Sequence, residues 1–288
     1  MSIELTEELR KNKAQFRYLR ERCGISLREI AEKAGFAEST IEIAERPGRK
    51  TYPSAKAWEY LLEQFENHKT WVDRNAIGFG KSGLPINIYR TTRGFGVNGI
   101  MSEDNAADAQ KRNARAAELA AVLSFENIDT KFVYTGHEVS EKNIEKATFR
   151  GIRERCRIAQ KTAAQELGYK SISILIKYED PDQKTCSVSD SARDWSFQKL
   201  EAHKNRVQAA IDSVKTAAAQ KNVKRVLFPY YLSQKHFNLY KTDDISFSEI
   251  NAANTETAVL LEKTGIESVF LYPETGYKYP DEYLIKTD

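Results

Sequence analysis

Apolar residues recur with helical spacing in the first quarter of the chain. They predict a short helix over 27–34, whose apolar residues share one face: Leu27, Ile30, Ala31 and Ala34. Ser26 precedes this helix and Glu29 lies three positions after it, which is the pattern of a capping box. Gly35 comes next, where a helix that ends in the left-handed conformation favours glycine. A second short helix is predicted over 37–44, so the pattern indicates two short helices joined by a tight turn.

Helical patterns cover roughly 5–75 and 140–220, and a mixed segment follows each of them. Each mixed segment is predicted to contain two strands, a helix and a closing strand. In the first half these elements fall within 84–99 (two strands), 102–125 (a helix capped by Ser102) and 128–135. In the second half they fall within 223–232, 235–242, 247–265 and 266–273. The predicted fold class is therefore α+β.

The two halves also repeat each other in sequence. FRYLRERC at 16–23 returns as FRGIRERC at 149–156, with Tyr18 replaced by Gly151. Matches continue in the same order to the end of each half, at an offset that only grows. This pattern predicts two duplicated units, each a helix-turn-helix (HTH) domain followed by a small β-β-α-β segment. The expected domains are 1–76 (first HTH domain), 77–138 (first α/β segment), 139–220 (second HTH domain) and 221–288 (second α/β segment).

Composition limits the possible functions without choosing one. The chain has 288 residues and a formal net charge of +3, too small to indicate nucleic-acid binding without a local arrangement to support it. No apolar run is long enough for a secretory signal or a membrane span, so we expect a cytoplasmic protein without a membrane partner. The three cysteines, Cys23, Cys156 and Cys186, are too few for a disulfide framework and lack metal-ligand spacing.

The two short helices resemble the HTH of the lambda-repressor-like, or Xre-type, DNA-binding family. The resemblance is carried by SLREIAEKAGFAESTIEIAE at 26–45, with Pro53 and Ser54 after it, and by IAQKTAAQELGYKSISILIKYED at 158–180. It covers about 55 residues of each half. Gln160 stands where the family usually has a Gln that touches a DNA phosphate, whereas the first half has Leu27 there. The resemblance implies double-stranded DNA as partner and a role in transcription regulation, of a prokaryotic or phage-like sort.

In this geometry the second helix of each motif enters the major groove with its N-terminal residues first. The expected DNA contacts of the first motif are Arg28, Glu38, Ser39, Thr40, Glu42, Arg46, Arg49 and Lys50. Those of the second motif are Gln160, Lys161, Lys170, Ser171, Ser173 and Lys177. Glutamates repel phosphates but can accept a hydrogen bond from cytosine, so the contrast between Glu38 and Lys170 predicts unequal half-sites.

An acidic first motif also favours an alternative, a protein-interaction scaffold of the antitoxin-like or regulator-binding sort. The α/β segments are candidates for pairing with a second copy of the chain or with another regulator. We expect no enzyme, because no catalytic constellation stands out, and we expect no metal or cofactor site. The glycines of 78–83 lack the spacing of a phosphate-binding loop and indicate a basic linker. His68 and His203 are expected near helix ends in structural roles.

Overall fold

The computed structural model describes residues 5–82, 85–89, 103–221, 225–241 and 245–273. The chain is mostly helical, with two small parallel sheets, which is compatible with the α+β class. The elements of the first half are α1 (Glu7–Lys11), α2 (Lys13–Arg22), α3 (Leu27–Ala34), α4 (Glu38–Glu45), α5 (Ala55–Ser82), β1 (Ile86–Ile88), α6 (Glu103–Phe125) and β2 (Phe132–Tyr134). Those of the second half are α7 (Glu141–Arg155), α8 (Gln160–Glu166), α9 (Ser173–Tyr178), α10 (Asp190–Lys221), β3 (Arg225–Pro229), α11 (Gln234–Phe237), α12 (Phe247–Glu262) and β4 (Glu267–Leu271).

The predicted helix-turn-helix of the first half is confirmed almost residue by residue. The hydroxyl of Ser26 accepts a hydrogen bond from the Glu29 amide at 3.0 Å, which starts α3. Gly35 ends the helix with a φ of 80°, in the left-handed region. The carboxylate of Glu29 turns instead to Tyr60 and Lys111, so the second bond of the expected capping box is replaced by contacts to α5 and α6.

Each sheet consists of two parallel strands joined through a helix. Ile86 pairs with Phe132 in the first sheet, and Arg225 pairs with Glu267 in the second. The strand predicted at 235–242 is wrong: Ser233 caps the short helix α11 there by accepting from the His236 amide at 3.2 Å. The second strand predicted within 84–99 falls mostly outside the described residues. The described part of the first mixed segment is therefore β-α-β, and that of the second is β-α-α-β because α11 precedes α12.

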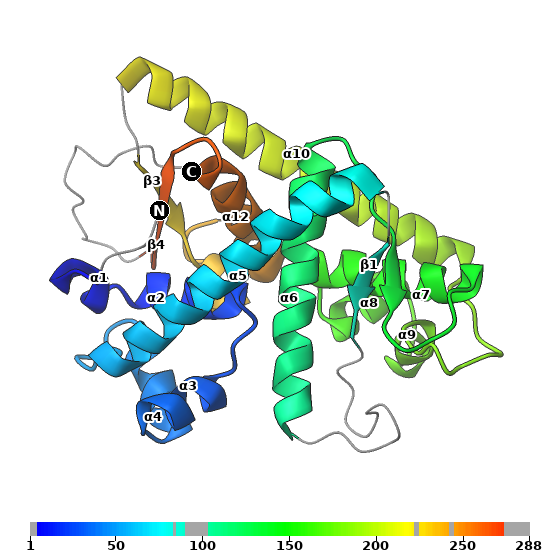
Figure 1. Ribbon diagram of the computed structural model, residues 1–288, viewed down its shortest axis with the longest axis horizontal. Coiled ribbons are helices and arrows are strands. Elements are labelled where there is room, and N and C mark those ends of the chain that lie inside the picture. The colour runs from blue at the N-terminus through cyan, green and yellow to red at the C-terminus, as the bar shows by residue number, and fades with distance from the viewer. Residues whose placement is uncertain (1–4, 83–84, 90–102, 222–224, 242–244, 274–288) are drawn as a thin grey trace.

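Two further expectations are corrected by the long helices α5 and α10. The segment 78–83, expected as a linker, is helical as far as Ser82, so α5 crosses the boundary expected at residue 76. His68 and His203 lie in the middle of these helices and are fully buried, rather than near helix ends. In Figure 1, α5 and α10 run across the molecule, and the pairs α3/α4 and α8/α9 lie on opposite sides of α6.

One strand of each sheet packs against the helix that carries the repeated octapeptide of the other half. β2 lies on α7, and β4 lies on α2. The ring of Phe270 on β4 stacks on Tyr18 at 3.7 Å between centroids. On the other side Gly151 makes room for Phe132, because a Cβ at residue 151 would approach that ring to 2.6 Å. Tyr18 and Gly151, at the position where the two octapeptides differ most, thus each lie where a strand of the other half packs against the helix.

Buried charges connect the same elements in both halves. Arg20 on α2 forms a two-fold hydrogen-bonded ion pair with Glu45 at 2.6 and 2.8 Å, and Arg153 on α7 does so with Glu179 at 2.5 and 2.8 Å. Two buried Arg–Glu–His clusters involve the same helices α2 and α7: Arg22 with Glu118 and His68, and Arg155 with Glu256 and His203. Because a buried charge without a partner costs several kcal/mol, these contacts fix how the helices meet.

The apolar core is continuous through the first half and interrupted in the second. One cluster joins α2–α5 to both sheets and to α6 and α12. A separate, smaller cluster belongs to α7–α10 and includes Phe149, Ile152, Leu175 and Tyr178. Among the described helices, none combines the length and the apolar character needed to cross a bilayer.

Candidate nucleic-acid interface

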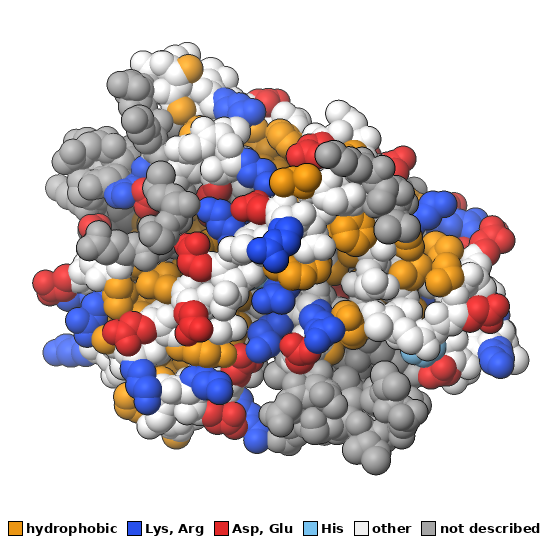
Figure 2. All heavy atoms as spheres, in the orientation of Figure 1, with side chains coloured by type: hydrophobic (Ala, Val, Ile, Leu, Met, Phe, Trp, Pro, Cys, Tyr) orange, Lys and Arg blue, Asp and Glu red, His pale blue; other side chains and the backbone are white. Residues whose placement is uncertain are grey.

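The predicted DNA contacts of the first motif gather on the exposed side of α3 and α4. Most are exposed, and several are already paired within the motif: Arg28 with Glu32 at 2.9 Å, and Glu42 with Arg46. Glu38 and Ser39 are exposed at the start of α4, and Thr40 is half-buried. Arg49 and Lys50 are exposed in the loop that follows α4. Figure 2 shows acidic and basic side chains intermixed over this part of the surface.

The predicted contacts of the second motif are more uniformly basic. Five of the six are exposed on α8, on α9 or in the turn between them: Lys161, Lys170, Ser171, Ser173 and Lys177. The sixth, Gln160, is half-buried and donates its amide to Glu179 at 2.8 Å. Gln160 therefore supports the buried Arg153–Glu179 pair, whatever else it contacts.

The two motifs are aligned by their buried residues. Ile41 and Leu175 point into the core at the same place, and so do Ala44 and Tyr178 and the paired glutamates, all at an offset of 134. By this register the counterpart of Glu38 is Ile172, which is 42% exposed, and not Lys170. Lys170 belongs to the turn before α9. The first turns of the two second helices thus differ by a carboxylate against an aliphatic side chain.

Two buried lysines hold the loops that follow these helices, and sequence reasoning missed both. The ammonium of Lys13 donates to the carbonyl oxygens of Arg46 and Arg49 at 2.9 and 2.5 Å. Lys146 donates in the same way to Asp180 and Gln183 at 2.6 and 2.8 Å. Burial lowers the pKa of Lys146. A lysine at the same place in each repeat, three residues before the shared FR, was the available signal.

A tyrosine at the closing strand of each α/β segment also reaches these helix ends. Tyr272, just after β4, donates its hydroxyl to the carbonyl of Glu45 at 2.8 Å, and Tyr134 at the end of β2 donates to that of Glu179 at 2.7 Å. The C-terminal end of α4 and the residue after α9 are thereby fixed. Their N-terminal ends, which would meet base edges, stay exposed.

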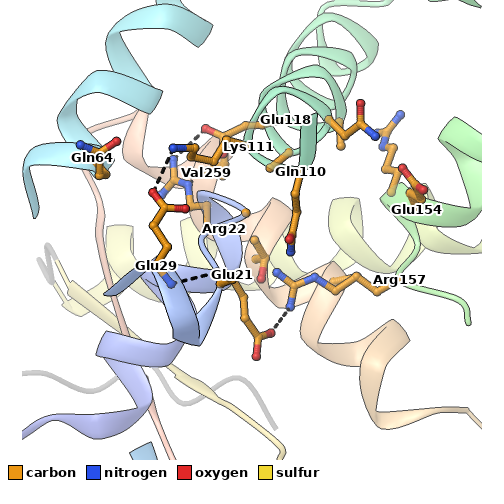
Figure 3. Close-up of a pocket in the computed structure, with 18 of the residues that line it drawn as sticks. Glu21, Arg22, Glu29, Gln64, Gln110, Lys111, Glu118, Glu154, Arg157 and Val259 are labelled. Atoms are coloured by element: carbon orange, nitrogen blue, oxygen red, sulfur yellow. Dashed lines mark hydrogen bonds and ion pairs between the residues drawn. The ribbon is translucent and has the colours of Figure 1, made fainter. Parts of the chain in front are cut away.

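A cleft of about 1460 Å³ separates the first motif from α6, α7 and α12 (Figure 3). Lys111 on α6 reaches Glu29 across it at 2.9 Å, and Arg157 meets Glu21 at 3.1 Å. Burial disfavours the charged form of Glu21, but the guanidiniums of Arg157 and Arg17 outweigh it and lower the pKa of Glu21 to about 2. The cleft is thus crossed by ion pairs that connect α3 to α6 and α2 to the second half.

The described ranges also show how possible metal ligands and two of the cysteines are placed. No three His, Cys, Asp or Glu residues gather there as a metal-binding set. Burial raises the pKa of the Cys23 and Cys156 thiols to about 12. These thiols are therefore protonated at neutral pH and act as small core residues.

No family model, curated protein or solved structure matches this chain. The resemblance to lambda-repressor-like proteins therefore stays a prediction from the motif residues.

Proposed function

We propose that the chain is a sequence-specific DNA-binding regulator of transcription, in which two different HTH motifs meet two half-sites of one duplex. The observation that carries the proposal is the way α4 and α9 are held. Each is fixed at its C-terminal end by a buried lysine, a tyrosine and an Arg–Glu pair, while its N-terminal turn is exposed. That is the presentation a helix needs in order to place N-terminal side chains in a major groove.

We also infer that the two halves arose by duplication and that one chain acts as a built-in pseudo-dimer. The support is the recurrence of the same buried contacts, at offsets of 133 to 138, in elements that occur in the same order. Dimeric HTH proteins set their two motifs one helical turn of DNA apart, roughly 34 Å. The crossed packing of β2 on α7 and β4 on α2 would fix that spacing within a single chain.

The two half-sites are expected to differ in how they are bound. The second motif offers lysines for phosphates and serines for base edges, and Ile172 suits a thymine methyl group. The first motif places Glu38 at the groove and ties its nearby basic Arg28 and Arg46 to glutamates. Most of the electrostatic affinity should therefore come from the second motif.

An interaction scaffold is the second candidate function. It is favoured by the same acidic first motif, together with Ile43 on α4, which is 41% exposed. In that case α4 would contact protein, and binding of DNA would be weak and unspecific or absent.

The test begins with selection of duplexes from a random DNA pool by the intact chain. Binding of the selected duplex is then measured by fluorescence anisotropy over a salt series. Changing both Lys170 and Lys177 to Gln should weaken binding and reduce the slope of log affinity against log salt by roughly two, since each lysine at a phosphate contributes about 0.9. Lys215→Gln, on the part of α10 remote from the motif, is the matched control and should change neither. Failure to select any sequence, or an unchanged slope in the double variant, would contradict the proposal.

A further inference from the structure

The long helices α5 and α10 begin with the same cap, which allows their residues to be compared one by one. The hydroxyl of Ser54 accepts from the Ala57 amide at 3.2 Å, and that of Ser189 accepts from the Ala192 amide at 3.2 Å. The fourth residue after each serine is Trp58 in the first half and Arg193 in the second.

Trp58 fills a space between α5 and the helices α1 and α2. It is fully buried, lies edge-on to Phe16 at 4.9 Å, and donates its indole N–H to the carbonyl of Arg10 at 3.3 Å. The helix breaks at Asn12, so that α1 is separate from α2 and its Leu9 packs on the same cluster. The first motif and the sheets consequently share one continuous core.

Arg193 leaves the equivalent space in the second half unfilled. Its guanidinium turns outward to Glu145 and Asp190, and α7 runs straight where the first half has the break between α1 and α2. A groove of about 810 Å³ lies there between α7, α10 and the start of β2. Its apolar walls are Ile128, Phe132, Phe149, Ile152, Phe197 and Leu200. Phe197 is 49% exposed, whereas Leu62 at the same place in α5 is partly buried against the core.

This groove lies between the two apolar clusters of the molecule. Phe132 belongs to the large central cluster, and Phe149 and Ile152 belong to the small cluster of the second motif. A molecule seated in the groove would contact both clusters at once. It would pack against Phe149 as Trp58 packs against Phe16 in the first half.

We propose that this groove is a ligand site for a small, neutral molecule with an indole-sized or larger aromatic ring. The aromatic body is indicated by Trp58, which fills the equivalent place. Neutrality is indicated by the charged residues that line the groove. Four carboxylates face four basic side chains there, and the remaining basic residue, Arg155, is paired with Glu256: the carboxylates are Asp129, Glu141, Glu145 and Glu201, and the basic residues are Lys131, Lys142, Arg193 and Lys204. The volume lies within the range of small-molecule sites in proteins, roughly 300–1,000 Å³.

Filling the groove should fix the second motif against the body of the protein. A ligand that packs on both clusters stabilises the orientation it binds best and so shifts the population toward it. If the proposed function is right, the same ligand changes the affinity for DNA; this consequence rests on that function, and the site itself does not.

The binding test uses 5-fluoroindole and the intact chain, followed by fluorine NMR. We expect saturable binding with a Kd below roughly 1 mM, which is modest for a ligand of this size. Arg193→Trp should place an indole in the groove, raise the Tm and weaken binding of 5-fluoroindole at least tenfold. Gln198→Trp, at an exposed position of the same helix, is the matched control and should leave binding unchanged.

Phe197→Ser is the second variant, because it removes one wall at a half-exposed position where folding is least affected. It should weaken binding several-fold. Absence of saturable binding, or equal binding by folded wild type and both groove variants, would overturn the site. So would a concentration-dependent dimer that Phe197→Ser abolishes, since a second copy of the chain would then be the occupant.

The effect on DNA is measured separately with the selected duplex. Saturating 5-fluoroindole should change the affinity of wild type and leave that of Arg193→Trp unchanged. Binding in the groove with unaltered DNA affinity would overturn the coupling while leaving the site intact. Failure of all DNA binding would count against the proposed function alone.

Discussion

The hydroxyl of Tyr272 donates to the carbonyl of Glu45 at 2.8 Å, so residues near the end of the described chain hold the end of α4 in the first motif. Tyr134 makes the reciprocal contact to Glu179 at 2.7 Å. Each HTH is therefore completed by the strand segment of the other half. The order of the strands along the chain could therefore be predicted from the sequence. The helices against which they pack could not, because those helices belong to the other half.

Removing either hydroxyl should destabilise the protein without disturbing its packing. Tyr272→Phe and Tyr134→Phe each leave a carbonyl at the end of a helix without its donor, at a cost of about 1–2 kcal/mol. Chemical denaturation of the purified variants measures this cost. Tyr240→Phe, which changes a partly exposed tyrosine on the surface after α11, should have a much smaller effect. Equal stability of all three variants and wild type would contradict the role given to the crossed tyrosines.

Cutting the chain between its halves should yield two fragments that need each other. Residues 1–138 lack the strand β4 that packs on α2, and residues 139–288 lack β2 that packs on α7. Each fragment alone would expose Tyr18 or the face of α7 around Gly151 to water, and we expect it to be largely unfolded. Mixing or coexpressing the fragments should restore the helical circular dichroism signal and a single 1:1 complex. Two fragments that fold separately and do not associate would show that the exchange is dispensable.

The local elements could be predicted from sequence because local chemistry determines them. Ser26 and Gly35 mark the two ends of α3, and short runs of apolar residues give the strands β3 and β4. The strand predicted at 235–242 is wrong because its aromatic residues, Phe237 and Tyr240, favour a strand, while Ser233 and the three residues after it close a helical turn. Cap geometry outweighed strand propensity over so short a stretch.

The residues of the candidate site could be predicted from the sequence. The alignment of the two motifs and the contacts that hold them in place could not. The motif residues are exposed where the pattern expected them, but Gln160 is committed to Glu179. Ile172 could be recognised as the counterpart of Glu38 only by aligning the buried Ile41 and Leu175, because the turn before α9 contains one more residue. Long-range partners such as Tyr272 leave no local signal, because the residue pattern of a strand does not indicate which helix the strand packs against.

The buried ion pairs under the two motifs should be far more sensitive than those on the surface. Glu179→Gln leaves the guanidinium of Arg153, which is 8% exposed, without its carboxylate, and Glu45→Gln does the same to Arg20. Loss of one partner of a buried pair costs about 3–5 kcal/mol. Glu32→Gln, in the exposed pair with Arg28, should cost less than about 1 kcal/mol. Urea denaturation compares the three, and similar values for all of them would contradict the assigned burial.

Acid should weaken the contact between the halves through Glu21. Burial opposes its charge, but Arg157 and Arg17 lower its pKa from the usual 4.5 to about 2 in the folded chain. A carboxyl with a depressed pKa contributes stability that is present above pH 4.5 and is lost as the pH falls toward 2. The drop in the pKa corresponds to a contribution on the order of 3 kcal/mol at neutral pH.

Glu21→Gln should therefore be less stable than wild type at pH 7, and the two curves of unfolding free energy against pH should converge toward pH 2. Glu7→Gln, at a fully exposed carboxyl on α1, should follow the wild-type curve closely. A constant gap between wild type and Glu21→Gln from pH 7 to pH 2 would show that the variant acts through packing and not through the charge that Arg157 holds across the cleft.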